Sequence, residues 1–459
     1  MRRLTLLRAR TQPMTEGNIP RHLLAYAIPA ILGDLFQVTY NTVDSIIVGK
    51  YAGADALAAV GIASPLMSVA MFFIIGMGIG ASVLMSEFYG AEDTRSLRRE
   101  FSTTLVMSTG LSCLIAAGLF MLSTPLLKLV HTPDAILGDT AGYLRIVAGG
   151  MVVTGLYNIL AAASRSIGDT RTPLVCLVAG SAVNVGLDLW FVAGFHWGVA
   201  GAAWATVISQ ACAAALCGWL LHRNEPVFFI DTEAPGRRAR FGVDHGLLKR
   251  TLRFSYASAL QQAGIYVGKL LVQSMVNPLG VQAAAAFTAV NRIDDYALIP
   301  ERDIASGETV LVAQNHGAGK FDRMQQGLRA AMVIEAAYGL IVSLAVFALA
   351  GPLMRLFVPP TETEVIRLGT HYLRLMGFFY FMPGITNGLQ GYMRAMGKMN
   401  ITMYVTYSQM FTRAVCTWLL IGHMKLDAVP LACVAGWILM LVWETGLIVH
   451  WKRTGKLYR

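Results

Sequence analysis

Charged residues are scarce in this chain: only 14% of its 459 residues are Asp, Glu, Lys or Arg. A soluble domain averages about 25%, so the shortage argues against a soluble fold. Apolar residues make up 55% of the chain, and they recur in runs of about 20, the length that crosses a hydrocarbon core. The short alternating segments of a transmembrane β-barrel are absent. The composition therefore predicts an all-α integral membrane protein, because a helix satisfies its own backbone hydrogen bonds in lipid.

The usual sequence motifs of enzymes are also missing. The chain has no G-x-x-x-x-G-K-[ST] nucleotide loop, no H-E-x-x-H and no G-x-S-x-G. Its six cysteines form no C-x-x-C or Cys/His cluster, so we expect them to pack as small apolar side chains. Gly76, Gly78 and Gly80 lie inside an apolar run, where glycines let helices pack closely. We therefore expect neither enzymatic activity nor a cofactor.

Polar breaks divide the chain into about twelve apolar runs that are each long enough to cross a membrane. Arginine and lysine concentrate in alternate breaks, which explains the net charge of +10 without nucleic-acid binding. The positive-inside rule then places both termini in the cytoplasm, with the protein in the plasma (inner) membrane. The expected spans are 22–48, 56–86, 100–124, 137–163, 173–195, 199–222, 250–275, 283–313, 326–351, 364–392, 399–422 and 428–450.

The longest polar break, 223–249, divides the spans into two halves that resemble each other. EFYGAEDT after the second span is matched by QNHGAGKF after the eighth, SRSIGDT by YMRAMGK, and GADALAAVG by GVQAAAAFT. Three matches in the same order, roughly 228 residues apart, indicate an internal repeat. Because each half has an even number of spans, the repeats should be parallel. We therefore expect six-helix lobes at 22–222 and 250–450, a cytoplasmic loop at 223–249, and cytoplasmic tails at 1–21 and 451–459.

Polar residues form one face of the first span, where Gln37, Asn41 and Asp44 lie at i, i+4 and i+7. The fifth span carries Asn184 and Asp188 one turn apart. A charge near the bilayer centre costs about 2.5–3.5 kcal/mol on insertion scales, so the two aspartates indicate a function. A carboxylate beside an amide suits a proton or a small cation. For either asparagine alone, a polar contact between helices is the alternative.

The eighth span is unusually rich in charge, and two interpretations of it are open. It is either the wall of an aqueous substrate cavity or a buried ion-pair network that fixes helix packing. Pro300 predicts a kink in the same helix. Lys269, Glu335 and Arg413 are further charges that fit either interpretation. The ionisable residues of the span are Arg292, Asp294, Asp295, Glu301, Arg302, Asp303 and Glu308.

Together these segments resemble the multidrug and toxic compound extrusion (MATE) family. The resemblance rests on YNTVDSIIVGKYAGADALAAVG, RSIGDTRTP, the N-x-x-x-D of the fifth span, GVAGAAWATVISQ and QNHGAGK, in this order from about Met14 onward. It implies two six-helix lobes in a V around a central cavity. Such lobes alternate between outward and inward openings and export organic cations or other xenobiotics against an inward flow of protons or sodium.

The resemblance also implies site residues. In the branch that couples through its N-terminal lobe, the key positions match Asp44, Asn184, Asp188 and Thr206, and we add the neighbouring Asn41. These residues would bind the proton, or sodium at Asp44, Asn184 and Asp188. A sodium-coupled branch instead carries an acid in the seventh span, where this chain has glutamines and a lysine. We expect the substrate cavity to be lined by Gln37, Gln262, Asp295, Glu301 and Arg302.

Pro29 interrupts the backbone hydrogen bonds of the first span, and we expect it to act as a hinge. Two other functions remain as alternatives. A flippase for a lipid-linked sugar, from the same superfamily, would need a large basic cavity for a diphosphate. A membrane-embedded enzyme would need a nucleophile–base pair or a metal site. The expected partners are small, cationic molecules, the coupling ion and membrane lipid, with no nucleic acid, and we expect a monomer.

Overall fold

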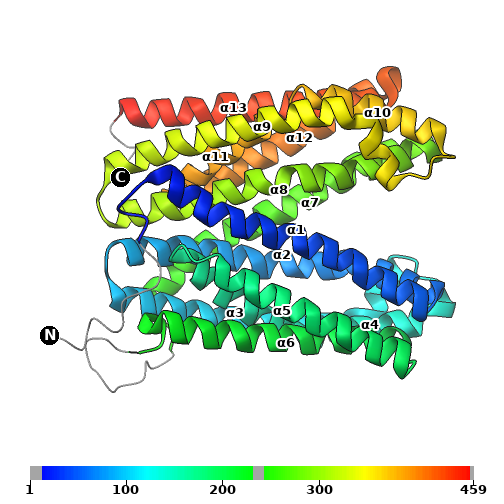
Figure 1. The fold of residues 1–459 in the computed structure, drawn as a ribbon, viewed down its shortest axis with the longest axis horizontal. Helices are drawn as coiled ribbons and strands as arrows, with labels where there is room; N and C mark the ends of the chain where they lie inside the picture. The colour runs from blue at the N-terminus through cyan, green and yellow to red at the C-terminus, as the bar shows by residue number, and fades with distance from the viewer. Residues whose placement is uncertain (1–12, 231–241, 455–459) are drawn as a thin grey trace. The chain divides into compact units, whose positions relative to one another are not determined.

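The structure is a computed structural model that describes residues 13–230 and 242–454. These residues are almost entirely helical (Figure 1), and the all-α fold expected from the composition is confirmed. The α-helices of the described residues are α1 (Ile19–Tyr51), α2 (Ala54–Gly90), α3 (Thr94–Leu129), α4 (Asp134–Ser166), α5 (Arg171–Asp188), α6 (Gly198–Asn224), α7 (His245–Val276), α8 (Val281–Gly317), α9 (Phe321–Phe357), α10 (Thr363–Gly377), α11 (Phe381–Ala395), α12 (Met399–Met424) and α13 (Ala428–Arg453).

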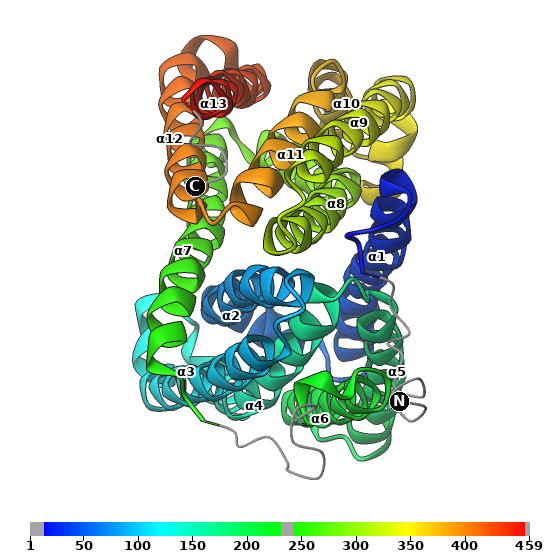
Figure 2. The same cartoon turned by 90° about the vertical axis from the view of Figure 1, so that its left-hand side faces the viewer.

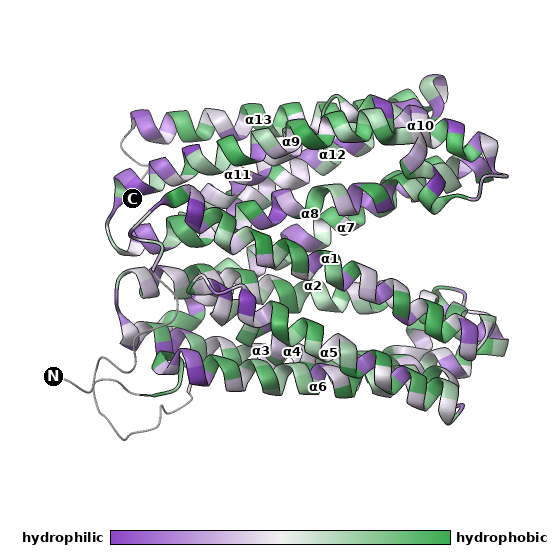
Figure 3. Ribbon diagram, in the orientation of Figure 1, coloured by the Kyte–Doolittle hydropathy of each residue, from purple (hydrophilic) through white to green (hydrophobic). Residues whose placement is uncertain are grey.

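Eight helical segments of the described residues are long and apolar enough to cross a membrane, with α12 and α13 counted together. Figure 3 shows the hydrophobic colouring along the helices. The expected tenth span, 364–392, was wrong as a single helix, because α10 and α11 have 15 residues each and are separate. The break has a local cause. Pro383 lies in the first turn of α11, and a proline there cannot continue a helix from the preceding residues.

The chain divides into two compact units, which we describe separately. Unit 1 contains Ile28–Ala259, and unit 2 contains Met14–Ala27 and Leu260–Arg459. The division falls inside α1 and α7, so each of these helices gives its first residues to one unit and the rest to the other. In unit 1, α4 packs against α2, α3 and α6. In unit 2, α8, α9 and α11 pack against one another (Figure 2).

Glycines bring helix backbones into contact within unit 1. A Cβ on Gly76 would lie 2.4 Å from the Cα of Ala259, and a Cβ on Gly80 would lie 2.5 Å from the backbone nitrogen of Ser255. No side chain fits at such distances, so α2 lies directly against the start of α7. The interpretation of these two glycines as helix-packing positions is confirmed.

The turns around α2 and α8 repeat each other. Both helices have 37 residues. Gly53 (φ 92°, ψ 178°) precedes α2 and Gly280 (φ 105°, ψ 167°) precedes α8, in a backbone conformation that only glycine adopts freely. Ala91 and Ala318 follow the two helices with φ of −76° and −77°. The repeat seen in the sequence is therefore present in the backbone.

A second pair of turns repeats in the same way. After α4, Gly168 has φ 90° and donates to the carbonyl of Arg165 at 2.9 Å. After α11, Gly397 has φ 71° and donates to the carbonyl of Arg394 at 2.9 Å. The Arg-x-x-Gly segments are thus helix ends that require a left-handed residue, which explains why glycine recurs.

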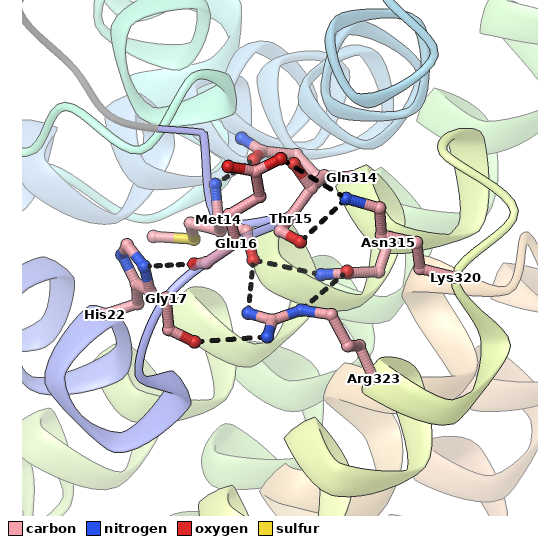
Figure 4. A network of polar contacts seen from close by, with 9 residues as sticks. All are labelled: Met14, Thr15, Glu16, Gly17, His22, Gln314, Asn315, Lys320 and Arg323. Carbon is pink, nitrogen blue, oxygen red and sulfur yellow. Dashed lines mark hydrogen bonds and ion pairs between the residues drawn. The ribbon is translucent and has the colours of Figure 1, made fainter.

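The segment before α1 is held against α8 and α9 of unit 2 (Figure 4). We name residues 14–17 the N-terminal strap. The Met14 nitrogen donates to Gln314 at 2.9 Å, and its carbonyl accepts from Asn315 and Arg323 at 3.2 Å. Arg323 also donates to the Gly17 carbonyl at 3.1 Å. The start of α1 is therefore fixed by side chains that lie about 300 residues further along the chain.

Candidate functional site

Two aspartates of unit 1 lie next to each other between helices α1 and α5. Asp44 is on α1, and Asp188 is the last residue of α5, directly before the π-helical turn Leu189–Gly194. Their carboxyl groups lie close enough to interact directly with each other. Asp188 is wholly buried and Asp44 is half-buried. π-helical turns are frequent at functional sites, and no pattern in the sequence predicted this one.

Asn184 connects Asp188 to two further helices. The side chain is wholly buried one turn before Asp188. With the amide placed as its neighbours require, its nitrogen donates to Tyr40 Oη and to Asp188 Oδ2, each at 2.8 Å, and its oxygen accepts from the Thr206 N–H at 3.1 Å. The Thr206 hydroxyl itself donates to the Ala202 carbonyl at 3.0 Å. Thr206 thus contacts this cluster through its backbone N–H group and not through its hydroxyl.

Two tyrosines complete the surroundings of the aspartate pair, and sequence reasoning missed both. Tyr40 on α1 and Tyr143 on α4 interact electrostatically with Asp44 and with Asp188. A phenol can donate or accept a hydrogen bond without carrying charge. The only signal in the sequence was that Tyr40 directly precedes the expected Asn41.

One oxygen of each aspartate is left without a partner. Asp44 Oδ1 and Asp188 Oδ1 are buried and make no hydrogen bond. An unpaired buried polar atom costs about 1–3 kcal/mol, so two of them in one place favour a bound proton or small cation. Among the described residues, no three His, Cys, Asp or Glu side chains are grouped to hold a metal ion. A sodium ion here would therefore need amide, phenol or backbone oxygens as further ligands.

Asn41 and Gln37 lie about one and two turns before Asp44 on α1 and contact each other. Gln37 Nε2 donates to Asn41 Oδ1 at 3.1 Å. Asn41 is exposed, whereas Gln37 is half-buried. Gln37 and Tyr40 also line a pocket of about 10 Å³, which is close to the space that one water needs. Pro29 lies further toward the start of the same helix, two residues after Ala27, where the unit 2 part of α1 ends.

The residues of the second half that were expected to line a cavity differ in exposure. Asp295 is exposed and pairs with Lys269 at 2.8 Å. Arg302 is exposed, and Gln262 is half-buried. Glu301 is wholly buried, and neither of its carboxyl oxygens has a hydrogen-bond partner. Its position fits the buried-network interpretation of α8, whereas Asp295 and Arg302 remain accessible.

Sequence reasoning also missed a buried acid of the last helix. Glu444 on α13 is wholly buried, and Arg394 on α11 interacts electrostatically with Glu308, Glu335 and Glu444. The available signal was a lone glutamate in the apolar segment LVWETGL. An ionisable residue inside such a segment marks a functional site by default.

An internally repeated set of membrane helices, with an acidic pair on two of them, is typical of transporters. A family model described as MatE matches residues 29–190 and 257–419. The chain therefore belongs to the MATE family, a family of transporters rather than enzymes. The two matched ranges begin 228 residues apart, one in each half, which confirms the internal repeat.

Several curated proteins resemble this chain over most of its length. "Probable multidrug resistance protein YpnP" of Bacillus subtilis is 27% identical over 411 residues, covering 88% of this chain and 90% of the relative. "Probable multidrug resistance protein NorM" of Thermotoga maritima is 23% identical and covers 86% and 84%. A protein of Shewanella oneidensis named "FAD transporter" is 23% identical and covers 85% and 86%.

Solved structures share the fold. The crystal structure of a MATE protein in the bent conformation superposes with a TM-score of 0.88 at 21% identity, covering 96% of this chain and 98% of that chain. A MOP superfamily transporter from Pyrococcus furiosus, described as having reversed binding-pocket polarity, gives 0.86 at 20% identity with the same coverage. At these identities the likeness supports the fold alone.

Proposed function

We propose that this chain is a proton-coupled antiporter that exports organic cations, with Asp44 and Asp188 as the proton-binding pair. The observation that supports this function is the direct interaction of the two carboxyl groups in unit 1. Two carboxyl groups in contact share a proton, because two carboxylates repel each other. Sodium is the alternative coupling ion.

The proton controls the charge that a substrate meets. When the pair loses its shared proton, two negative charges lie near each other and attract a cation. When a proton returns, that attraction weakens and the cation is released. Asn184 can hold Asp188 in place in both states, because an amide offers both a donor and an acceptor.

Pro29 is proposed to convert the change of charge into movement. It has no N–H, so the carbonyl of Ala25 lacks its helical partner and α1 can bend at this turn. We propose that the lobes 22–222 and 250–450 alternate in access, with Gln37, Gln262, Asp295, Glu301 and Arg302 along the substrate path. Asn41 and Thr206 would support the coupling site.

The proposed substrates are cationic drugs and related xenobiotics. The names of the Bacillus and Thermotoga relatives support multidrug export, whereas the Shewanella relative is named for a flavin nucleotide, an anion. We propose a monomer in the plasma (inner) membrane with both termini in the cytoplasm.

Ethidium efflux from proteoliposomes tests this function. We expect an imposed pH gradient to drive efflux by the unaltered protein, and Asp44→Asn or Asp188→Asn to abolish it. Asp34→Asn is the matched control, because it makes the same change at an exposed position of α1. Normal efflux in both site variants would reject the assignment. Efflux driven by a sodium gradient alone would reject the proton as coupling ion.

A further inference from the structure

Unit 2 contains four buried glutamates that the proposed proton exchange in unit 1 does not use. We name them the glutamate row: Glu301 and Glu308 on α8, Glu335 on α9, and Glu444 on α13. Each has a relative exposure of 0%. By hydrogen-bond geometry none of their carboxyl oxygens has a partner, although Glu335 lies near the Gly388 N–H and Glu444 near the Gln390 amide. Native proteins leave few buried polar groups unpaired, so this concentration needs a physical explanation.

Helix α11 makes room for three of these side chains. Gly384, Gly388 and Gly391 lie at i, i+4 and i+7, so they share one face of the helix. A Cβ on Gly388 would lie 2.6 Å from Glu335 Oε2. On Gly391 it would lie 3.3 Å from Glu308 Oε2, and on Gly384 it would lie 3.5 Å from Glu301 Oε1. We name these residues the glycine face. Each glycine thus has one carboxyl group nearby, and at Gly384 and Gly391 a backbone carbonyl lies nearer still.

The positive charge near the glutamate row is too small to balance four carboxylates. Arg394 of α11 interacts electrostatically with Glu308, Glu335 and Glu444. Tyr338 faces Glu301 and brings no charge at neutral pH, and Gln390 lies beside Glu444 as a neutral amide. If all four carboxyl groups were ionised, one arginine would leave three negative charges in the interior of the unit. Such a state is strongly unfavourable, and a buried acid without a partner neutralises instead.

Two kinds of ligand can neutralise a carboxylate here, a proton or a metal cation. A cation needs several oxygens at one point, typically six or more for calcium. Among the residues that the structure describes, no three acidic, histidine or cysteine side chains are grouped in that way. Three of the glutamates are instead distributed along the glycine face, each at its own position, and Glu444 lies on α13. Separate carboxyl groups in an apolar unit suit protons.

We propose that the glutamate row is a second proton-binding site of this protein, distinct from Asp44 and Asp188 and contained within unit 2. In the state of this structure its carboxyl groups carry protons, and at most one is ionised opposite Arg394. The glycine face holds the neutral carboxyl groups against the α11 backbone. The site does not depend on the role proposed for the aspartate pair.

Infrared spectroscopy of the purified full-length chain in detergent tests the proposal. A protonated carboxyl group has a C=O stretching band that is separate from the carboxylate bands and shifts in D₂O. At neutral pH we expect this band in the unaltered protein and a partial loss of it in Glu301→Gln, Glu335→Gln and Glu444→Gln. Glu364→Gln is the matched control in the first turn of α10, where the carboxylate is accessible and pairs with Arg367, and it should leave the band unchanged.

A second protein variant separates the row from the aspartate pair. The double variant Asp44→Asn, Asp188→Asn should keep the part of the band that the row produces, whether or not it still transports. This measurement also tests the proposal if the glutamine variants fail to fold. A band absent from the double variant would overturn the proposal, as would a band that none of the three substitutions in the row reduces. Loss of the band when sodium chloride replaces choline chloride at constant pH would also overturn it, because the row would then bind a metal cation.

Discussion

Unit 1 and unit 2 share their turns but not their buried acids. The glycines before α2 and α8 and those after α4 and α11 adopt matching backbone conformations. Unit 1 places its acids as a contacting pair on α1 and α5 and as Glu100 on α3, which accepts hydrogen bonds from Thr104 and Thr251. Unit 2 places four glutamates on α8, α9 and α13. The repeat has therefore kept the residues that form the fold, while the charged interior of each unit has changed independently.

The correspondence between α2 and α8 makes this difference specific. Counted from Gly53 and Gly280, Glu301 corresponds to Ile74 and Glu308 corresponds to Ala81. Both counterparts in unit 1 are apolar and wholly buried. Unit 2 thus carries carboxyl groups where unit 1 carries apolar core side chains, and burying an unpaired polar group costs stability.

The segments that precede α1 and α7 show a second parallel. The N-terminal strap is bound by side chains of α8 and α9 in unit 2. In unit 1, Ser102 and Thr103 of α3 accept from the N–H groups of Gly242 and Asp244 at 2.7 and 3.0 Å. The N–H groups of Leu247 and Gly246 hold the pKa of Asp244 below its usual range. Both units therefore fix the start of a helix that continues into the other unit.

Placing a glutamate in unit 1 at the position that corresponds to Glu301 should have the largest effect on stability. Ile74→Glu puts a carboxyl group at a wholly buried position where the neighbours are apolar. We expect a loss of about 3–5 kcal/mol, the cost of an unpaired buried charge. Thermal unfolding in detergent, followed by size-exclusion chromatography, measures it. A melting temperature equal to that of the unaltered protein would mean that unit 1 tolerates the acid as unit 2 does.

The reverse exchange should stabilise the protein. Glu301→Ile gives unit 2 the residue of unit 1 and removes a carboxyl group without hydrogen-bond partners. A buried polar group without a partner costs about 1–3 kcal/mol, and this substitution removes that cost. A raised melting temperature with altered pH dependence of efflux is the expected result. A lowered melting temperature would show that Glu301 contributes to folding.

Filling the glycine face should destabilise unit 2 moderately. Gly388→Ala places a methyl group 2.6 Å from Glu335 Oε2, and overpacking of this kind costs about 1–3 kcal/mol. Gly446→Ala on α13 is the control, because no atom lies within 4 Å of its Cβ position. Adding Glu335→Ala should recover part of the loss in the Gly388→Ala background. Equal melting temperatures for the two alanine variants would remove the case for a glycine face fitted to carboxyl groups.

The fold was predictable where it depends on local residue types. Apolar runs, Arg-x-x-Gly and Gly-Ala turns predicted the helices and the repeat, because these signals act over one or two turns. The break between α10 and α11 was missed because Pro383 lies in an apolar run that looks continuous. Asp44, Asn184 and Asp188 stood out as polar residues in apolar spans. Tyr40, Tyr143 and the partners of Glu444 depend on which helices meet, which the sequence does not encode locally.

Release of the N-terminal strap should have the smallest effect. Arg323→Ala removes hydrogen bonds to the carbonyls of Met14 and Gly17, a loss of about 1–3 kcal/mol if the carbonyls find no other partner. Limited proteolysis near residue 14 should become faster. Arg329→Ala, at an exposed position of the same helix, should leave the rate unchanged. Equal rates in both variants would show that the strap does not need Arg323.

Proton release on substrate binding tests the central claim most directly. Purified protein in weakly buffered solution would be mixed with ethidium while a pH-sensitive dye reports protons. If the aspartate pair exchanges its proton for a cation, the unaltered protein and Asp34→Asn should release protons as ethidium binds. Asp44→Asn and Asp188→Asn should release none. Equal proton release from all four proteins, with ethidium binding intact, would contradict the account.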